Sequence, residues 1–325
     1  MSRYVARRRA ELGLAPREVA IPQTHPAGAE AEVDFGEFYA FLGGENLKCW
    51  MFVMRLSNSG RAFHVAFGTQ AQEAFLEGHV LAFEHFGGVP ARVRYDNLKP
   101  AVVRVLKGRD RAESERFIAL RSHYLLTPSS AVPASTVRTR RAVWKVRSAG
   151  SADATWFRSP RVGSLAELNE VLAAGDVLDD GRVITGRSVT VGAAFAAEAA
   201  APMALPQETF DPARHLQARV DNRARVSVRQ CFYSVPARYA GRRLAVRLAA
   251  RTVEIHDGPT LVARHERAVG RYVEVLTLDH YLEVLKTKPG GLPGATALAQ
   301  AKSRGAFSAS RPTASATSGG TDPSR

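Results

Sequence analysis

The stretch Ala31-Glu-Val-Asp-Phe-Gly-Glu37 decides the fold of this 325-residue chain, and Val93-Arg-Tyr-Asp-Asn-Leu-Lys99 completes it. Each stretch carries an aspartate, Asp34 or Asp96, on or at the end of a predicted β-strand. Carboxylates are the ligands that hard divalent cations such as Mg²⁺ prefer. Two carboxylates placed in this way provide two thirds of a three-acid metal site.

The segments around Asp34 predict an antiparallel meander. Strand-like runs cover residues 31–41, 48–56 and 61–67, and the turn sequences Gly43-Gly-Glu-Asn46 and Ser57-Asn-Ser-Gly60 separate them. Helical periodicity follows over 70–86 and stops at Gly87-Gly88, and a short strand covers 89–95. A second helix is predicted over 113–123. Three strands, a crossover helix and a fourth strand ending in an acid are typical of a ribonuclease-H-like α+β (α/β) fold.

The rest of the chain predicts four regions. A basic helix and linker occupy 1–28, and the core occupies 29–200. Within it, Ser164-Leu-Ala-Glu167 is a capping box that opens a helix through Leu172. A small DNA-binding β-barrel is expected at 208–270, because short strand-like runs lie at 225–228, 231–235, 244–248, 253–255 and 261–265. A helix and a disordered Ser-, Thr-, Ala- and Gly-rich tail are expected at 271–325.

Bulk composition favours a polyanionic partner. The formal net charge is +14 and the sequence pI is about 10.3, and clustered Arg and Lys gain by displacing counterions from phosphates. Arginine-rich codon usage is the competing explanation. Only Cys49 and Cys231 are present, far apart, so neither a disulfide framework nor a zinc site is indicated. No apolar signal region or membrane span is evident, and we expect a cytoplasmic protein.

Basic residues form two candidate DNA-binding clusters. One follows Asp96 and the other lies in the predicted barrel, where Tyr233 and Tyr239 are available for stacking. The first cluster contains Lys99, Arg104, Lys107 and Arg109, and the second contains Arg238, Arg242 and Arg243. Solvated surface charge is the competing interpretation of both clusters. If the clusters contact phosphates, DNA binding would be sensitive to salt and independent of the DNA sequence.

Three histidines are candidate metal ligands by residue type. His64, His79 and His85 have spacings that match no ligand motif, and two of them lie on the predicted helix at 70–86. Packing or surface roles are therefore predicted for all three.

Several runs together resemble the IstA-type transposases of bacterial insertion sequences, which belong to the retroviral-integrase superfamily. The resemblance covers about 4–125 and 162–307. Its motifs are Ala31-Glu-Val-Asp-Phe-Gly-Glu37, Phe75-Leu-Glu-Gly-His79, Phe86-Gly-Gly-Val-Pro90, Tyr95-Asp-Asn-Leu-Lys99, Glu115-Arg-Phe-Ile-Ala-Leu-Arg-Ser-His-Tyr124 and Tyr233-Ser-Val-Pro236. It implies a DNA strand-transferase in which Asp34 and Asp96 are the first and second acids that bind Mg²⁺ (or Mn²⁺). It also implies oligomers on paired element ends, a helper ATPase, and an upstream helix-turn-helix region that this chain lacks.

The third acid of the family is missing. The family carries it in a motif like His-Glu-Lys-Gly-Gly-Val-Glu, where this chain has Arg138-Thr-Arg-Arg-Ala-Val-Trp-Lys145. Trp is encoded only by TGG and Lys begins with AA, so reading from the last base of the Trp144 codon gives GAA, which encodes Glu. The same offset can recover the whole motif. We hypothesise that about 126–160, an aberrant basic segment without sustained helical or strand periodicity, is translated out of frame.

Loss of the third acid predicts negligible strand transfer. Lys145 places a positive charge where a cation should bind, and this weakens metal binding. Asp153, Glu113 and Glu115 are poor substitutes, because they lie in unpatterned sequence or in a helix that already matches the family. Two alternatives to an active transposase remain: a non-catalytic DNA-binding remnant, and a decayed gene product that does not fold stably.

Overall fold

The computed structural model describes residues 8, 24–95, 102–105, 111–130, 160–303 and 305, with the backbone alone at 102–105, 111–113 and 128–130. The predicted basic helix and linker at 1–28 therefore lie outside the described residues except for residues 8 and 24–28, and the predicted disordered tail lies almost wholly outside them. The chain divides into two compact units. The first contains residues 1–215 and 247–253, and the second contains 216–246 and 254–325.

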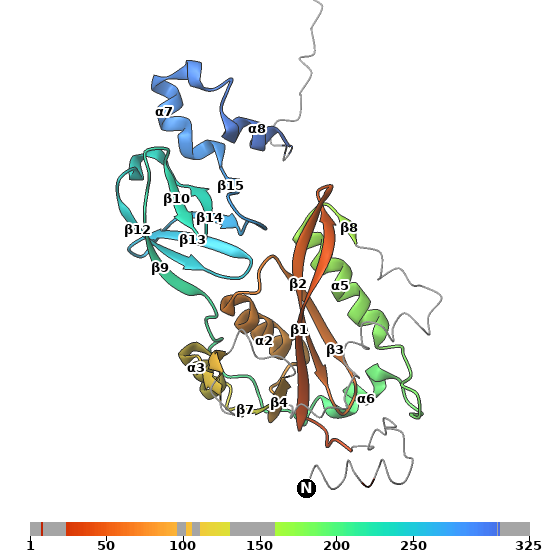
Figure 1. Cartoon of the computed structure of the whole chain (residues 1–325). Coiled ribbons are helices and arrows are strands. Elements are labelled where there is room, and N and C mark those ends of the chain that lie inside the picture. Colours follow the sequence, from red (N-terminus) through yellow and green to blue (C-terminus); the bar gives the residue numbers. More distant parts are fainter. Residues whose placement is uncertain are drawn as a thin grey trace, which may run out of the picture. The chain divides into compact units, whose positions relative to one another are not determined.

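The first unit is built on a mixed sheet in the strand order β3-β2-β1-β4-β7 (Figure 1). Its strands are β1 Glu30–Leu42, β2 Glu45–Leu56, β3 Ala62–Phe67, β4 Arg92–Tyr95 and β7 Thr127–Ser130, and β8 Arg161–Val162 pairs with the far end of β1. Strands β1, β2 and β3 pair antiparallel, whereas β4 is parallel to β1 and β7 is parallel to β4. The predicted meander is confirmed.

Helices cover both faces of this sheet (Figure 1). Helix α2, Gln72–Phe86, and helix α3, Glu115–His123, contribute to a core that also contains Phe35, Phe52 and Phe67. Helix α5, Leu165–Asp179, packs through Leu168 and Leu172 on the opposite face, against alternate residues at the far end of β1. Because strand side chains alternate between faces, one strand can serve both cores.

Gly78 allows α2 to approach the sheet closely. A Cβ atom built on Gly78 would lie 2.5 Å from Cγ of Phe52, whose ring is fully buried. The glycine in the Phe75-Leu-Glu-Gly-His79 run is therefore required by packing, since no larger residue fits between the helix and β2.

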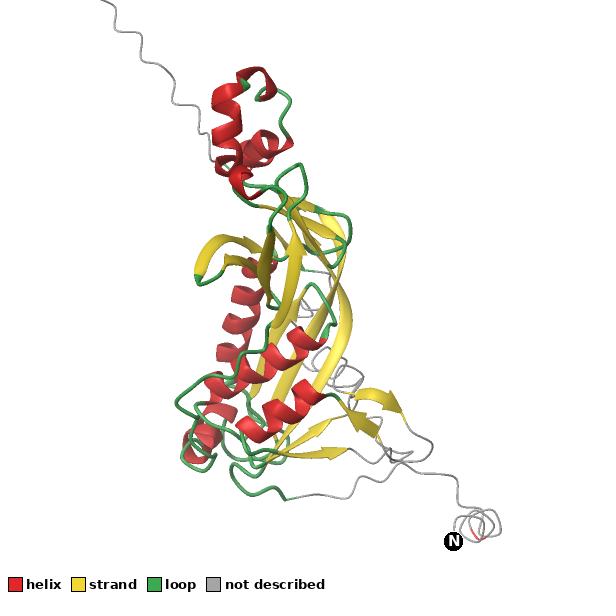
Figure 2. Ribbon diagram, turned by 90° about the vertical axis from the view of Figure 1, so that its left-hand side faces the viewer, coloured by secondary structure: helices red, strands yellow, loops and turns green. Residues whose placement is uncertain are grey.

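The predicted capping box at the start of α5 is confirmed. The hydroxyl of Ser164 accepts the amide N–H of Glu167 at 3.1 Å, and the Glu167 carboxylate accepts the amide N–H of Gly163 at 2.6 Å. The helix continues to Asp179, beyond the predicted end at Leu172. Figure 2 shows this unit with its helices packed along the sheet.

Helix α6, Val191–Glu198, was not predicted. It supplies a carboxylate that is 1% exposed, and the carboxylate oxygens of Glu198 accept the amide N–H groups of Gly28 at 2.9 Å and Ser59 at 3.0 Å. These bonds tie the segment that enters β1 to the turn that leaves β2.

The prediction that 126–160 lacks regular structure is wrong at its start. Residues Thr127–Ser130 form β7, which pairs with β4 from Arg92↔Thr127 to Tyr95↔Ser130. Strand β4 offers backbone donors and acceptors along its open edge, and these bonds form whatever side chains β7 carries. Pro128 is tolerated because β7 is the last strand on this side of the sheet. Residues 131–159 lie outside the described part.

The C-terminal strands form two sheets. The three-stranded sheet contains β10 Arg225–Val228, β11 Cys231–Ser234 and β15 Glu274–Val275; the four-stranded sheet contains β9 Arg214–Arg219, β12 Arg243–Leu248, β13 Thr252–Asp257 and β14 Thr260–Glu266. The predicted strands are present within one or two residues, and a turn that begins at Asp257-Gly258 joins β13 to β14. An isolated bridge, Val220↔Val226, links β10 to the residue that follows β9. Closure of these sheets into a barrel stays a prediction.

The remaining elements are short. Strands β5 Val102–Val105 and β6 Arg111–Glu113 form a two-stranded sheet. After β15, the chain forms η3 Leu278–Tyr281, α7 Leu282–Thr287, η4 Pro289–Gly291 and α8 Thr296–Ser303. Among the described residues, no helix combines the length and the hydropathy needed to cross a membrane.

Candidate functional site

Asp34 lies in the middle of β1 on the face opposite the α2 core. Its neighbours in sequence, Val33 and Phe35, are buried in that core, whereas Asp34 itself is partly buried. Glu30 and Glu32 share its face, because side chains two residues apart on a strand point the same way. At Gly36, the next position on this face, an added Cβ would meet no described atom within 4 Å. Among the described residues, this face of the sheet is therefore open at Gly36, two residues after Asp34.

Strand β4, which ends one residue before the second aspartate, pairs with β1 beside the first. The parallel register pairs Glu32 with Arg94 and Val33 with Tyr95. Val33 immediately precedes Asp34, and Tyr95 immediately precedes Asp96. Asp96 itself lies outside the described residues. The described part thus places the residues that lead into the two predicted ligands opposite each other on adjacent strands.

Arg94 neutralises the two glutamates that precede Asp34 on its face. Its guanidinium lies 3.0 Å from a carboxylate oxygen of Glu30 and 3.3 Å from one of Glu32. His25 approaches Glu30 at 3.5 Å. These acids are therefore engaged in ion pairs at the start of the strands and are poor candidates for the missing ligand.

His64 lies in the same row of the sheet as Asp34, but two strands away. Val53 pairs with Asp34 on one side and with His64 on the other. Adjacent strands are about 4.8 Å apart, so the backbones at His64 and Asp34 are separated by about 10 Å. The ring nitrogen Nδ1 of His64 lies 2.5 Å from a carboxylate oxygen of Asp176 on α5. This contact links β3 to α5.

His79 is a buried packing residue, as predicted. It is fully buried among aromatic rings, and its Nδ1 donates to the carbonyl oxygen of Phe75 at 2.7 Å. Its Nε2 therefore accepts the hydroxyl of Tyr95 at 3.0 Å. Burial lowers the pKa of His79 to about 4, although the bond to Phe75 opposes the shift. The histidine is neutral at pH 7 and supports the end of β4.

The ring of His85 also packs against aromatic rings. Its centre lies 5.2 Å from the ring centre of Phe63 and 5.3 Å from that of Phe86. Burial lowers the pKa of His85. In the described residues no three His, Cys, Asp or Glu side chains come together as a metal-binding group. Cys49 and Cys231 are buried free thiols, and burial raises the pKa of Cys49 to about 11.

Most of the basic cluster after Asp96 lies outside the described part. Lys99, Lys107 and Arg109 fall there, and only the backbone of Arg104, in β5, is described. The segment Arg138 to Lys145, where the third acid is missing, also lies outside the described residues.

In the second unit, Arg238 and Arg242 flank Tyr239. Their guanidinium carbons lie 5.2 and 5.4 Å from the centre of its ring. Each arginine is also paired with an acid, Arg238 with Glu283 at 2.8 Å and Arg242 with Asp257 at 2.9 Å. This arrangement is an aromatic platform with cationic sides, a surface suited to nucleic acid.

Tyr233 is not available for stacking, because it is 2% exposed and its hydroxyl oxygen accepts the amide N–H of Ala268. Arg247 and Arg251, two further arginines of the predicted barrel, belong to the first unit. They pair there with Asp211 at 2.6 Å and with Glu77 at 2.7 Å. Arg243 is exposed at the start of β12.

Known proteins similar to this chain are transposases. The Mu transposase C-terminal domain family matches residues 205–277. A transposase for insertion sequences IS1326/IS1353 from Pseudomonas aeruginosa is 33% identical over 283 residues, which cover 84% of this chain and 54% of that protein. A transposase from Aminobacter aminovorans is 30% identical over 292 residues, which cover 88% of this chain and 57% of that protein.

Solved structures give a weaker likeness. A chain of the simian T-cell lymphotropic virus intasome matches with a TM-score of 0.39 at 11% identity, over 79% of this chain and 86% of that chain. The HTLV-2 integrase catalytic core domain in complex with magnesium matches with a TM-score of 0.36 at 13% identity, over 52% of this chain and 97% of that chain. Scores this low leave the ribonuclease-H-like assignment as a proposal.

The chain is therefore a mixed α+β protein related to DNA-transposition proteins. It belongs with the insertion-sequence transposases, and the resemblance drawn from its motifs is confirmed. The chain spans about half the length of the curated relatives it matches, 54% and 57% in these two cases.

Proposed function

We propose that this chain acts on DNA as an insertion-sequence transposase of the IstA type, with a ribonuclease-H-like core and a small C-terminal β-barrel. The order β1, β2, β3, α2, β4, with an antiparallel meander followed by a parallel strand, supports such a core. The match of 205–277 to a Mu transposase domain supports a second, DNA-binding region.

The observation that carries the proposal is the parallel pair Val33↔Tyr95, which precedes Asp34 and Asp96 by one residue. Asp34 is partly buried and supplies the hard oxygen donors that Mg²⁺ requires. Asp34 and Asp96 would hold the ion, and Mg²⁺ (or Mn²⁺) supplies charge stabilisation for phosphoryl transfer when it is bound. The sheet register pairs the residues that precede the two aspartates, and the bond between His79 and Tyr95 holds the end of β4.

The proposed site is incomplete, and we expect negligible strand transfer from the chain as written. Arginines, a tryptophan and a lysine replace the family motif at Arg138 to Lys145. Two carboxylates bind one cation more readily than two cations, because each additional positive charge needs anionic partners. Weakened metal binding and lost joining activity follow from this charge deficit.

The partners proposed for the chain are DNA, as element ends and target, a helper ATPase and further copies of the same chain. The net charge of +14 supports DNA. The ATPase and the oligomer rest on the family resemblance.

A non-catalytic DNA-binding remnant is the second candidate. It is favoured by the missing third acid together with the ordered second unit, whose exposed Arg238 and Arg242 and half-buried Tyr239 could bind DNA without any metal. The two candidates differ in whether Asp34 binds a cation.

Titration of the purified chain with Mn²⁺, followed by electron paramagnetic resonance, tests the metal site. We expect weak binding that Asp34→Asn abolishes. Glu37→Gln is the matched control, since Glu37 lies on the same strand but is exposed and paired with Lys48. Equal Mn²⁺ binding by the unchanged chain and by Asp34→Asn would exclude the proposed site and favour the remnant.

A further inference from the structure

A tight turn and an exposed tyrosine form a basic corner in the second unit, consisting of Arg229, Gln230, Arg271 and Tyr272. Arg229 and Gln230 connect β10 to β11, and the pair Val228↔Cys231 closes this two-residue turn. The amide N–H of Tyr272 donates to the carbonyl oxygen of Gln230 at 2.9 Å. The tyrosine backbone therefore lies directly against the turn.

Three residues of the basic corner adopt left-handed backbone conformations. The φ angles are 49° at Arg229, 67° at Gln230 and 59° at Tyr272. Two-residue hairpin turns of this kind favour Asn-Gly, because glycine and asparagine tolerate positive φ. Arginine, glutamine and tyrosine are unfavourable at these positions, so folding alone does not explain why they are there. Strain of this kind is typical of sites where the side chains have a function.

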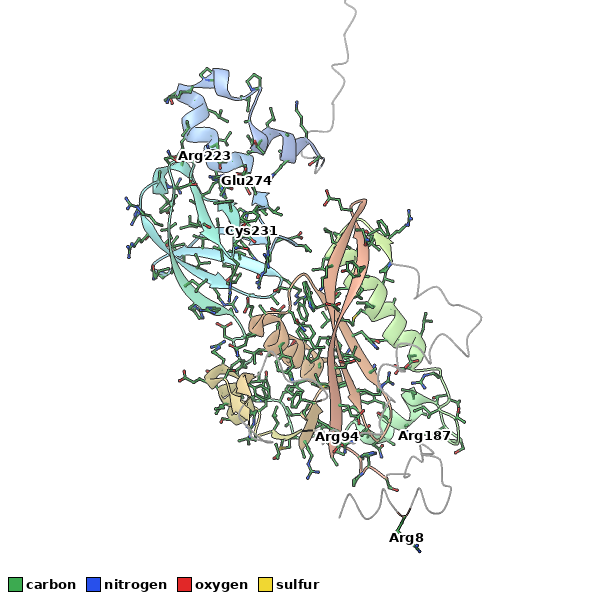
Figure 3. The ribbon with its side chains drawn as sticks, viewed as in Figure 1. Arg8, Arg94, Arg187, Arg223, Cys231 and Glu274 are labelled. Atoms are coloured by element: carbon green, nitrogen blue, oxygen red, sulfur yellow. The ribbon has the colours of Figure 1, made fainter. Side chains whose placement is uncertain are left out.

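The backbone around Tyr272 is held in place while its ring faces solvent. The amide N–H of Phe232 donates to the carbonyl oxygen of Val273 at 2.9 Å. The thiol of Cys231 donates to the carbonyl oxygen of Gly270 at 3.6 Å. Strand β15 then continues the pairing with β11, and Figure 3 labels Cys231 and Glu274 in this region. Tyr272 is nevertheless 72% exposed. A fixed backbone and a free aromatic face lower the entropic cost of binding a planar group.

The charge at the basic corner is positive. Residues 226–233 and 267–273 contain Arg229, Arg267 and Arg271, and neither stretch contains Asp or Glu. The next acid along the chain, Glu274, is already paired with Arg225. The surroundings of Tyr272 therefore favour an anionic ligand.

We propose that the basic corner binds an unpaired nucleotide at a DNA end, with Tyr272 stacked on the base and Arg229 and Arg271 contacting the neighbouring phosphates. The proposal rests on the proposed function of the chain as a DNA-binding transposase. Aromatic stacking accepts any base but needs a free base face, which the interior of a duplex does not offer. Guanidinium groups match phosphate oxygens in pairs. The basic corner would thus distinguish a single-stranded end from intact duplex.

Fluorescence anisotropy with the full chain and two labelled DNAs tests this inference. One DNA is a blunt duplex, and the other carries a short single-stranded extension. We expect the unchanged chain to bind the extended DNA about ten-fold more tightly than the blunt duplex. Tyr272→Ala should abolish this preference with a change of less than about two-fold in the affinity for blunt duplex, and Tyr272→Phe should keep the preference, because stacking needs only the ring.

The double substitution Arg229→Asn with Gln230→Gly separates binding from folding. It relieves the positive-φ strain, so the melting temperature should rise while the preference for extended DNA falls. A preference that survives both Tyr272→Ala and this double substitution would overturn the inference. Equal binding of both DNAs by the unchanged chain would overturn it and leave the proposed function standing, whereas failure to bind either DNA would contradict both.

Discussion

The Nε2 atom of His79 on α2 lies 3.0 Å from the hydroxyl of Tyr95, the last residue of β4. Tyr95 pairs with Val33, which precedes Asp34, and is itself followed by Asp96. A single buried hydrogen bond thus connects α2 to the residue that precedes Asp96 and pairs with the residue before Asp34. The bond requires a neutral histidine, because a protonated Nε2 cannot accept the tyrosine hydroxyl.

The buried histidine should make the fold sensitive to acid. The pKa of His79 is about 4 in the folded chain, against an ordinary value of about 6.5 when unfolded. Its contribution to stability is complete above pH 6.5 and is lost as the pH falls toward 4, since the unfolded chain binds the proton more tightly. At pH 5 the loss is on the order of 2 kcal/mol.

Urea unfolding at pH 7.5 and pH 5.0 measures this loss. His79→Leu should lower the stability at pH 7.5, where the Tyr95 hydroxyl loses its partner, but it should flatten the dependence on pH. His280 in the second unit adds a similar sensitivity, because burial and the neighbouring His265 lower its pKa to about 4. An equally steep loss of stability with and without His79 would rule out this origin.

Gly78→Ala should destabilise the first unit. The added methyl group would lie 2.5 to 2.9 Å from three atoms of the Phe52 ring, so either α2 or the ring must move. Overpacking of this kind costs about 1–3 kcal/mol. Thermal unfolding measures the effect, and Gly36→Ala is the control because its methyl group meets no described atom within 4 Å. If Phe52→Leu does not recover part of the loss in the double variant, the close contact is not the cause.

Correcting the reading frame over residues 138–160 should restore strand-transfer activity. Replacing residues 138–160 with the out-of-frame reading of the same bases supplies the third carboxylate, and the chain continues at Arg161. That reading is His-Glu-Lys-Gly-Gly-Val-Glu-Gly-Glu-Ile-Gly-Arg-Phe-Arg-Arg-Arg-His-Leu-Val-Pro-Val-Pro. We expect Mn²⁺-dependent joining of element ends to rise by a factor of at least about 10², the effect of one charge-stabilising group. Asp34→Asn in the restored chain should remove the gain. Comparable joining by the original chain would contradict the idea that this segment is defective.

Sequence patterns located most of the strands, because turn residues such as Asp257-Gly258 and alternating apolar residues act locally. They missed elements whose formation depends on distant partners. Thr127–Ser130 carries no strand signal and pairs only because β4 presents an open edge, and the Ala-rich α6 lacks an apolar stripe and is anchored through Glu198.

The candidate site shows the same difference between local patterns and contacts with distant partners. Asp34 and Asp96 were identified by residue type and motif, but the register that brings their predecessors together depends on how α2 crosses the sheet. The exposed ring of Tyr272 was missed because a single tyrosine in a loop has no sequence signature. Its significance depends on backbone angles and exposure, which only the structure shows.

The arginines of the second unit should differ in their contributions to DNA binding. Arg238 and Arg242 are already paired with Glu283 and Asp257, whereas the exposed Arg243 makes no ion pair with a described residue. An arginine must give up its carboxylate before it binds a phosphate, and this exchange reduces what Arg238 and Arg242 gain from DNA. Arg243→Ala should therefore weaken binding of blunt duplex more than Arg242→Ala does.

Salt titrations give a second readout for Arg243. The slope of log affinity against log salt should decrease by about 0.9 when Arg243 is removed, as expected for one lost phosphate contact. Glu283→Gln should have the opposite effect and strengthen binding, because it releases Arg238 from its pair. Equal losses for Arg242→Ala and Arg243→Ala, with no gain for Glu283→Gln, would mean that the ion pairs do not control access of these arginines to DNA.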